Sequence, residues 1–230
     1  MCGILGFYIK NAGASDFQLI RDLFKQSQVR GRHATGISFL TSKLETIIEP
    51  LPAEDFIEKH LSNAQIEKMI NPDGGFYAIG HCRYSTSDLK YNQPIHNKFM
   101  SIVHNGVITQ EPYELWEEKY KAKCVTRCDS ELIIHSTNPL SDYKSMSVAA
   151  AELLPDKSLR FYRNGKRPLH YCLFEKGVII TSTKNILVRS SPALVSKMVE
   201  PMKYYTVNSE MKITKNKVLT ADFQDLQCNS

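Results

Sequence analysis

The sequence predicts an α+β fold in which helices flank antiparallel sheets. Apolar residues recur at helical spacing within 17–24, after a candidate helix cap at Asp16, which is typical of an amphipathic helix. In the last third of the chain, apolar runs at 159–162, 171–174 and 178–182 are separated by turn-forming residues. These runs indicate a β-meander, so helix and sheet both contribute to the core.

The middle of the chain adds further strands and helices. Asn105-Gly106 follows an apolar run, and this dipeptide favours a tight turn with positive φ. We therefore expect the preceding strand to end there. The other expected elements are extended segments at 37–40, 76–81 and 99–104, and helices that begin at Pro112 and near Asp129.

Length and composition fit one domain that spans residues 1–230. A chain of 230 residues, 42% of them hydrophobic, can bury one substantial core. It contains no run of about 18 apolar residues, so we expect no membrane span. It also has no charged-then-apolar leader. We therefore expect a cytoplasmic protein.

Six cysteines are scattered along the chain, and a chain of this size does not need disulfides to fold. We expect reduced thiols. Cys124 and Cys128 form the one close pair, but the sequence offers no second pair and no histidine at zinc-site spacing. We therefore interpret this pair as structural, and we expect no metal and no cofactor.

The chain is mildly basic. Its formal net charge is +5, but the lysines and arginines are interleaved with 24 acidic residues. Residues 160–167 are rich in basic side chains around Asn164-Gly165, a pattern that a polar hairpin explains as well as a phosphate contact does. We expect a solvated surface and no nucleic-acid partner.

Cys2 is the first candidate for chemistry. If Met1 is removed, this residue carries a thiol and a free α-amino group together. An α-amino group titrates near ~7.7, so it can accept the thiol proton directly or through water. A lone cysteine is otherwise often a buried small apolar group. The segments that follow decide between the two interpretations.

Five short motifs follow Cys2 across nearly the whole chain. They are, in order, Arg30-Gly31 with Gly36, Gly80-His81-Cys82-Arg83-Tyr84-Ser85-Thr86, Asn92-Gln93-Pro94, His104-Asn105-Gly106 and Asp129-Ser130-Glu131. In order and spacing this set resembles the glutaminase domain of class II glutamine amidotransferases. These are N-terminal-nucleophile hydrolases that include the amino-terminal halves of glucosamine-phosphate synthase and phosphoribosylpyrophosphate amidotransferase. The resemblance implies a four-layer αββα sandwich.

The resemblance also implies a glutamine site. A guanidinium fork grips a carboxylate through two parallel hydrogen bonds, which suits Arg83 to the α-carboxylate of glutamine. By resemblance, Thr86 lines the same pocket and Asp129 binds the α-ammonium. Arg30 is expected, by resemblance alone, to help order the N-terminus.

The catalytic groups expected by resemblance are Cys2, Asn105 and Gly106. Attack of the Cys2 thiolate on the side-chain amide of glutamine creates an oxyanion. The Asn105 side-chain amide and the Gly106 N–H would stabilise it, each contributing about 3–4 kcal/mol. Collapse would release ammonia and leave a γ-glutamyl thioester, which water would hydrolyse to glutamate, with the Cys2 amine moving the protons.

The chain departs from the family pattern at three places. His33 stands where an aspartate is expected, Ser87-Asp88 where a glycine is expected, and Gln110 where an asparagine is usual. None of these changes removes a primary catalytic group, so we expect activity. Residues 163–169 keep the family's arginine-to-Pro-Leu hairpin pattern.

The familiar relatives continue into a synthase domain, and this chain offers no such second half. We therefore expect a stand-alone glutaminase that supplies ammonia to a separate acceptor polypeptide. Two alternatives stay open. One is an amidohydrolase of γ-glutamyl compounds, and the other is a catalytically idle domain that binds glutamine or a partner protein.

Overall fold

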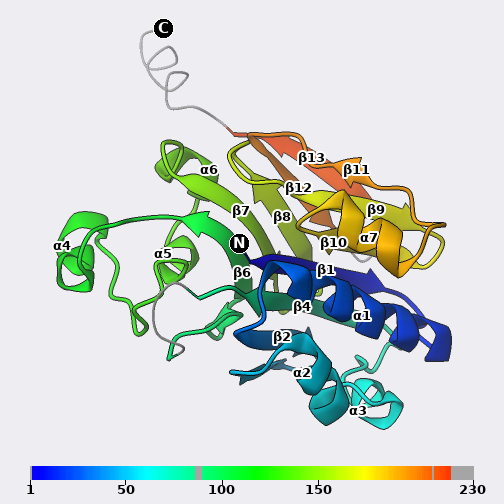
Figure 1. Cartoon of the computed structure of the whole chain (residues 1–230). Helices are drawn as coiled ribbons and strands as arrows, with labels where there is room; N and C mark the ends of the chain where they lie inside the picture. The colour runs from blue at the N-terminus through cyan, green and yellow to red at the C-terminus, as the bar shows by residue number, and fades with distance from the viewer. Residues whose placement is uncertain (1, 86–89, 209, 219–230) are drawn as a thin grey trace, which may run out of the picture.

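A computed structural model describes residues 2–85, 90–208 and 210–218. Two antiparallel sheets lie face to face, and helices cover both outer faces, so the chain forms four layers (Figure 1). This arrangement confirms the predicted α+β sandwich. Within the described residues, no helix is both long and apolar enough to cross a membrane.

The first sheet has seven strands in the order β11-β9-β10-β1-β4-β2-β3. Its strands are β1 (Gly3–Ile9), β2 (Ala34–Leu40), β3 (Leu44–Glu49), β4 (Phe76–Arg83), β9 (His170–Phe174), β10 (Gly177–Thr181) and β11 (Lys197–Met198). β1 runs antiparallel to β4 with Gly3 opposite Cys82. This register brings the beginning of β1, and therefore Cys2, to the end of β4 that carries Arg83.

The second sheet has six strands in the order β13-β12-β8-β7-β6-β5. They are β5 (Ile95–His96), β6 (Ser101–Val107), β7 (Ser147–Leu153), β8 (Leu159–Arg163), β12 (Lys203–Val207) and β13 (Ile213–Lys217). Consecutive strands β8 and β9 belong to different sheets, so the expected single meander over 159–182 is wrong. Periodicity identifies strands but not their partners, and residues 164–169 cross between the sheets instead of closing a hairpin.

Helices pack on both outer faces. The first sheet is covered by α1 (Ala14–Ser27), α2 (Ala53–His60), α3 (Asn63–Glu67) and α7 (Lys184–Ser190). The second is covered by α4 (Trp116–Tyr120), α5 (Glu131–Ile134) and α6 (Pro139–Asp142). Two 3₁₀ turns, η1 (Gln28–Arg30) and η2 (Tyr113–Leu115), precede β2 and α4. The helix expected at Pro112 is thus divided into η2 and α4.

β1 shows why the layers hold together. Its seven residues are all buried, because one face meets helices and the other meets the second sheet. Leu5 and Phe7 belong to the core under α1, whereas Ile4 and Tyr8 belong to the core between the sheets. A strand buried on both faces reads as a continuous apolar run without alternation.

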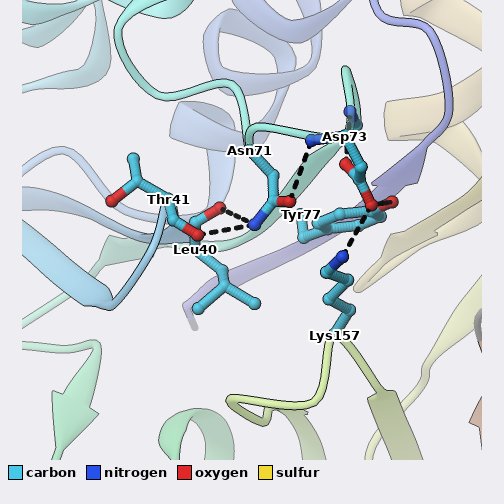
Figure 2. A network of polar contacts seen from close by, with 7 residues as sticks. Leu40, Thr41, Asn71, Asp73, Tyr77 and Lys157 are labelled. Carbon is cyan, nitrogen blue, oxygen red and sulfur yellow. Dashed lines mark hydrogen bonds and ion pairs between the residues drawn. The ribbon is translucent and has the colours of Figure 1, made fainter.

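A polar network ties the sheets together at the Phe76 end of β4 (Figure 2). Asn71 Nδ2 donates to the carbonyl oxygen of Thr41 at 2.5 Å, in the turn between β2 and β3. Asp73 Oδ2 accepts from Tyr77 Oη at 3.0 Å and pairs with Lys157 Nζ at 2.8 Å. Lys157 lies in the β7–β8 turn of the second sheet, so the network joins both sheets at the end of β4 opposite Arg83.

Candidate active site

The end of the sandwich that carries Arg83 holds a cavity of about 450 Å³. Its lining includes every predicted site residue that the structure describes, namely Cys2, Arg30, Arg83, Asn105, Gly106 and Asp129. Thr86 lies outside the described residues. These residues come from the position before β1, from η1, β4 and β6, and from the segment before α5, so the fold brings together positions up to 127 residues apart in the chain.

The backbone of Cys2 is held from two sides. Its carbonyl oxygen accepts from Arg30 Nε at 2.8 Å and from Asn105 Nδ2 at 2.9 Å. Its Sγ accepts from the Tyr84 N–H, with a 3.4 Å separation between sulfur and nitrogen. Burial, the largest effect, lowers the pKa of Arg30, which lies between this carbonyl and the cavity. Arg30 therefore contacts the N-terminal segment, the part of the chain that the resemblance predicts it helps to order.

The Asn105 amide is also bound to Ser182. Nδ2 donates to Ser182 Oγ at 2.9 Å, and this hydroxyl oxygen also accepts from the Ile4 N–H at 2.5 Å. Both Nδ2 hydrogens are thus engaged in this structure. Donation to an oxyanion therefore requires Asn105 to exchange one of these two bonds. Ser182 follows β10, and its place beside β1 could not be predicted from the sequence.

Gly106 has a backbone conformation and surroundings that suit only glycine. Its φ is +149°, and a Cβ at this position would lie 1.7 Å from the carbonyl oxygen of Ser147. The expected tight turn at Asn105-Gly106 is wrong, because β6 continues through both residues, with Asn105 opposite Ala149 and Gly106 opposite Val148 in β7. The positive φ is present, but it serves a close approach of two strands.

Arg83 and Asp129 are already anchored by the protein. Arg83 Nη1 donates to the carbonyl oxygen of Tyr91 at 2.6 Å and to Asn92 Oδ1 at 2.7 Å. Asp129 Oδ2 accepts from the N–H groups of Ile108 and Thr109 at 2.6 and 3.3 Å. Among the described residues, Asp129 Oδ1 has no hydrogen-bond donor, so this oxygen is available to a cation in the cavity.

A buried network connects the elements that carry Asn105 and Asp129. Gln93 Oε1 accepts from the His104 N–H at 2.6 Å, and Gln93 Nε2 donates to Ser130 Oγ at 3.1 Å. His104 Nδ1 lies 2.9 Å from Ser130 Oγ, and Nε2 lies 3.1 Å from the carbonyl oxygen of Ser147. A carbonyl only accepts, so Nε2 carries the proton and Nδ1 accepts from the serine. Burial lowers the pKa of His104, which keeps the imidazole neutral.

His81 lies in β4 and is almost fully buried. Neither ring nitrogen has a hydrogen-bond partner among the described residues. Burial lowers the pKa of His81 to about 3, because the imidazolium would lose its hydration. His81 is therefore neutral at physiological pH.

The His33 departure has a structural counterpart. Its N–H donates to the Arg83 carbonyl oxygen at 3.0 Å, and its Nδ1 accepts from the Ser85 N–H at 2.9 Å. The ring also contacts that of Tyr84, with 5.0 Å between centroids. His33 thus supports the segment that follows Arg83. Gln110 is exposed, and Ser87-Asp88 lies outside the described residues.

Three potential metal ligands meet beside this site. Ligand atoms of Cys124, Glu131 and His135 lie within 4.8 Å of one another, although the sequence placed no histidine at metal-site spacing. Glu131 is occupied structurally, since it accepts from the N–H groups of Val125 and Thr126 at 2.7 and 2.6 Å. Burial raises the pKa of Cys124 to about 12, which favours the thiol over the thiolate that binds metals. Glu131 therefore holds the loop before Asp129.

Comparison with known proteins gives a clear result for the fold. No protein-family model matches the sequence, and a search of curated proteins returns no match. Among solved structures, the chain is similar to the glutamine phosphoribosylpyrophosphate amidotransferase from B. subtilis, with a TM-score of 0.71 and 18% identity over 94% of this chain and 49% of that one. A structure described as the allosteric regulatory enzyme of purine biosynthesis gives a TM-score of 0.68 at 18% identity, with the same coverage of 94% and 49%.

A third similar structure is a glutamine aminotransferase class-II domain protein from Silicibacter pomeroyi, with a TM-score of 0.53 and 10% identity over 96% of this chain and 100% of that one. The chain therefore shares the fold of these amidotransferase structures, in agreement with the fold that the resemblance implied. The chain spans about half the length of the first two structures that it matches, 49% in each case.

Proposed function

We propose that this chain is a glutamine-hydrolysing enzyme with Cys2 as its nucleophile. The observation that carries the proposal is the convergence of Cys2, Arg83, Asn105, Gly106 and Asp129 on one cavity. A free glutamine presents a carboxylate, an ammonium and a neutral amide. The cavity offers one complementary group for each, together with a thiol.

Binding uses the two charged ends of glutamine. The α-carboxylate pairs with Arg83, whose guanidinium is oriented by the Tyr91 carbonyl and Asn92. The α-ammonium pairs with Asp129, whose Oδ2 is held by backbone N–H groups while Oδ1 faces no donor among the described residues. Thr86 completes this pocket by resemblance.

The chemistry begins after removal of Met1, which frees the α-amino group of Cys2. That amine takes the thiol proton, and the thiolate attacks the side-chain carbonyl carbon of glutamine. Asn105 Nδ2 and the Gly106 N–H stabilise the oxyanion. The C–N bond then breaks, the nitrogen leaves as ammonia with the proton from the amine, and water cleaves the thioester to give glutamate and free Cys2.

We further propose that residues 1–230 act as one glutaminase domain and that a separate polypeptide accepts the ammonia. The nucleophile and the two charged binding groups, Arg83 and Asp129, line one cavity of this chain, which supports a donor site within a single domain. A cytoplasmic location would keep the Cys2 thiol reduced.

Intact mass spectrometry with a glutamine-analogue electrophile tests the proposal. 6-Diazo-5-oxo-norleucine should add once, on Cys2 of a chain that has lost Met1, and the same sample should release glutamate from glutamine. Cys2→Ala should abolish both results, whereas Cys172→Ala, a buried thiol remote from the cavity lining, should retain them. Turnover by Cys2→Ala would place the nucleophile elsewhere. A processed chain that binds glutamine without hydrolysing it would support the idle binding domain.

A further inference from the structure

The cavity carries more positive charge than glutamine needs. Its described lining includes four arginines and one carboxylate, namely Arg30, Arg83, Arg127, Arg167 and Asp129. Glutamine itself has one carboxylate and one ammonium, so Arg83 and Asp129 balance it completely. The remaining three guanidinium groups need another explanation.

Two of the three have partners within the protein. Arg30 Nε donates to the Cys2 carbonyl oxygen at 2.8 Å. The Arg127 guanidinium lies 3.8 Å from a Glu114 carboxylate oxygen and stacks over the Tyr113 ring, 5.5 Å from its centroid. Each of these two groups therefore already has a partner within the protein.

Arg167 differs from these two. Its guanidinium makes no hydrogen bond or ion pair with the residues that the structure describes, although the side chain is partly buried and lines the cavity. Its backbone is braced, because Arg163 Nη1 donates to the Arg167 carbonyl oxygen at 3.4 Å and Arg163 Nε donates to the Val199 carbonyl oxygen at 2.6 Å. A braced backbone thus presents an uncompensated cation to the cavity.

Arg167 lies in a segment that is fixed to the second sheet, and it lines the same cavity as Cys2. It lies in the crossover 164–169, which is joined to the beginning of β7 by the bond from Asn164 Nδ2 to the Met146 carbonyl oxygen, 2.7 Å long. Its charge acts on Arg30, the residue bound to Cys2, where it adds to the larger effect of burial in lowering the Arg30 pKa. Arg167 therefore shares the cavity lining with Cys2 and Arg30, and it is a second cation beside Arg83, which is assigned to the α-carboxylate.

We propose that the site accepts γ-glutamyl compounds whose leaving amine bears an anionic group, such as a γ-glutamyl amino acid or peptide, and that Arg167 binds this anion. The inference rests on the proposed function and names its substrate class. Arg83 and Asp129 hold the glutamyl end, which γ-glutamyl compounds share with glutamine. The leaving amine extends beyond Cys2, where the guanidinium of Arg167 can form two parallel hydrogen bonds with a carboxylate.

The reaction keeps the same balance of atoms as glutamine hydrolysis. The thiolate of Cys2 forms the C–S bond, and the γ-amide C–N bond breaks. The proton taken from the thiol goes to the leaving nitrogen, so an amino acid or peptide departs as a neutral amine that is then protonated by solvent. Water cleaves the thioester, and the products are glutamate and the amino acid or peptide.

Two matched substrates test the proposal in the processed, full-length enzyme. γ-Glutamylglycine and γ-glutamylethylamide share the glutamyl end and differ in the carboxylate of the leaving amine. Wild type should hydrolyse γ-glutamylglycine with the higher kcat/KM. This preference should shrink as sodium chloride is raised, because salt screens the ion pair.

Arg167→Gln should lose roughly 10- to 100-fold more kcat/KM on γ-glutamylglycine than on γ-glutamylethylamide, the range expected for a hydrogen bond between charged groups. Lys166→Gln is the control, because it removes the same charge from the adjacent, exposed position and should leave the ratio of the two substrates unchanged. Equal losses by Arg167→Gln on both substrates, or the same ratio change in Lys166→Gln, would overturn the proposal.

The two levels of inference fail differently. If wild type hydrolyses glutamine but shows no salt-sensitive preference for γ-glutamylglycine, the role of Arg167 is wrong and the proposed function stands. This wild-type comparison is decisive even if Arg167→Gln does not fold. If processed wild type hydrolyses none of the three substrates and forms no adduct on Cys2, the proposed function fails and the inference fails with it.

Discussion

The side-chain amide of Asn105 donates to the carbonyl oxygen of Cys2 at 2.9 Å. The group proposed to stabilise the oxyanion is therefore bonded to the backbone of the proposed nucleophile, across a sequence separation of 103 residues. A second bond ties the same nitrogen to Ser182. The structure thus has the two proposed catalytic residues in contact, and both hydrogens of the proposed oxyanion donor are bound by the protein.

Replacement of Asn105 by alanine tests its proposed role directly. Loss of one oxyanion donor typically lowers kcat by about 100- to 1000-fold, because the interaction forms mainly in the transition state. We expect a kcat decrease of this size for Asn105→Ala, with KM nearly unchanged, in steady-state glutamate release. Asn216→Ala, on exposed β13, is the control and should behave as wild type. An increase in KM with normal kcat would assign Asn105 to ground-state binding instead.

Ser182 offers a separate test of how Asn105 is held. Ser182→Ala removes the acceptor that Nδ2 uses at 2.9 Å and leaves the Ile4 N–H without its partner at 2.5 Å. We expect a loss of about 1–3 kcal/mol in unfolding free energy, because a buried donor becomes unsatisfied. Urea unfolding measures this loss, and Ser196→Ala, on a part-buried serine that contacts His170, is the comparison. Unchanged stability would show that water or another group replaces the hydroxyl.

The Asp129 assignment predicts a substrate-dependent effect. Asp129→Asn keeps an acceptor for the Ile108 and Thr109 N–H groups but removes the charge that would bind the α-ammonium. We expect kcat/KM for glutamine to fall at least tenfold. Glutaramate, which keeps the carboxylate and the amide but lacks the ammonium, should be affected much less. Equal losses on both substrates would mean that Asp129 acts only by holding the backbone.

Individual residues show what could be predicted from the sequence. The helix within 17–24 follows from periodicity, because it buries one regular set of side chains. The strand at 76–81 could be proposed only from its apolar run, because both of its faces are buried. β1 gave no such signal, since both of its faces are buried. The pairing of strands was also out of reach: β8 and β9 are adjacent in the chain but face each other across the core, with Phe161 and Tyr171 rings 5.7 Å apart.

The residues of the candidate site also fall into two groups, those that could be predicted from the sequence and those that could not. Side chains whose chemistry matches a substrate group, such as Arg83 and Asp129, could be proposed from residue type and motif. Ser182 and His135 could not, because their relevance depends on tertiary neighbours: the former lies against β1 and the latter beside Cys124. The prediction of a turn at Asn105-Gly106 was wrong, because a glycine with positive φ also occurs where two strands approach each other closely.

Gly106→Ala should destabilise the fold. The new Cβ would lie 1.7 Å from the Ser147 carbonyl oxygen, at a φ of +149° that L-residues rarely adopt. Relief requires β6 and β7 to separate locally, and we expect at least about 2 kcal/mol of lost unfolding free energy, measured in urea. Gly13→Ala is the matched control, since nothing lies within 4 Å of a Cβ there. A Gly106→Ala protein as stable as Gly13→Ala would contradict the strain argument.

His81 should make the protein sensitive to mild acid. Burial holds its folded-state pKa at about 3, whereas the unfolded chain has a histidine pKa near ~6.5. Above that pH the imidazole is neutral in both states and contributes nothing to the pH dependence. Below that pH, His81 binds a proton in the unfolded state but stays neutral in the folded state. The unfolding free energy therefore decreases as the pH is lowered, down to a pH of about 3.

Between pH 6.5 and 4.5 this group alone should lower the unfolding free energy by about 2–3 kcal/mol. Urea unfolding across this range should show a shallower pH dependence in His81→Gln than in wild type, with each protein referred to its own value at pH 7. His96→Gln, at an exposed histidine in β5, should keep the wild-type slope. Parallel curves for wild type and His81→Gln would mean that His81 is protonated within the folded protein, and that a hydrogen-bond acceptor approaches its buried ring nitrogens.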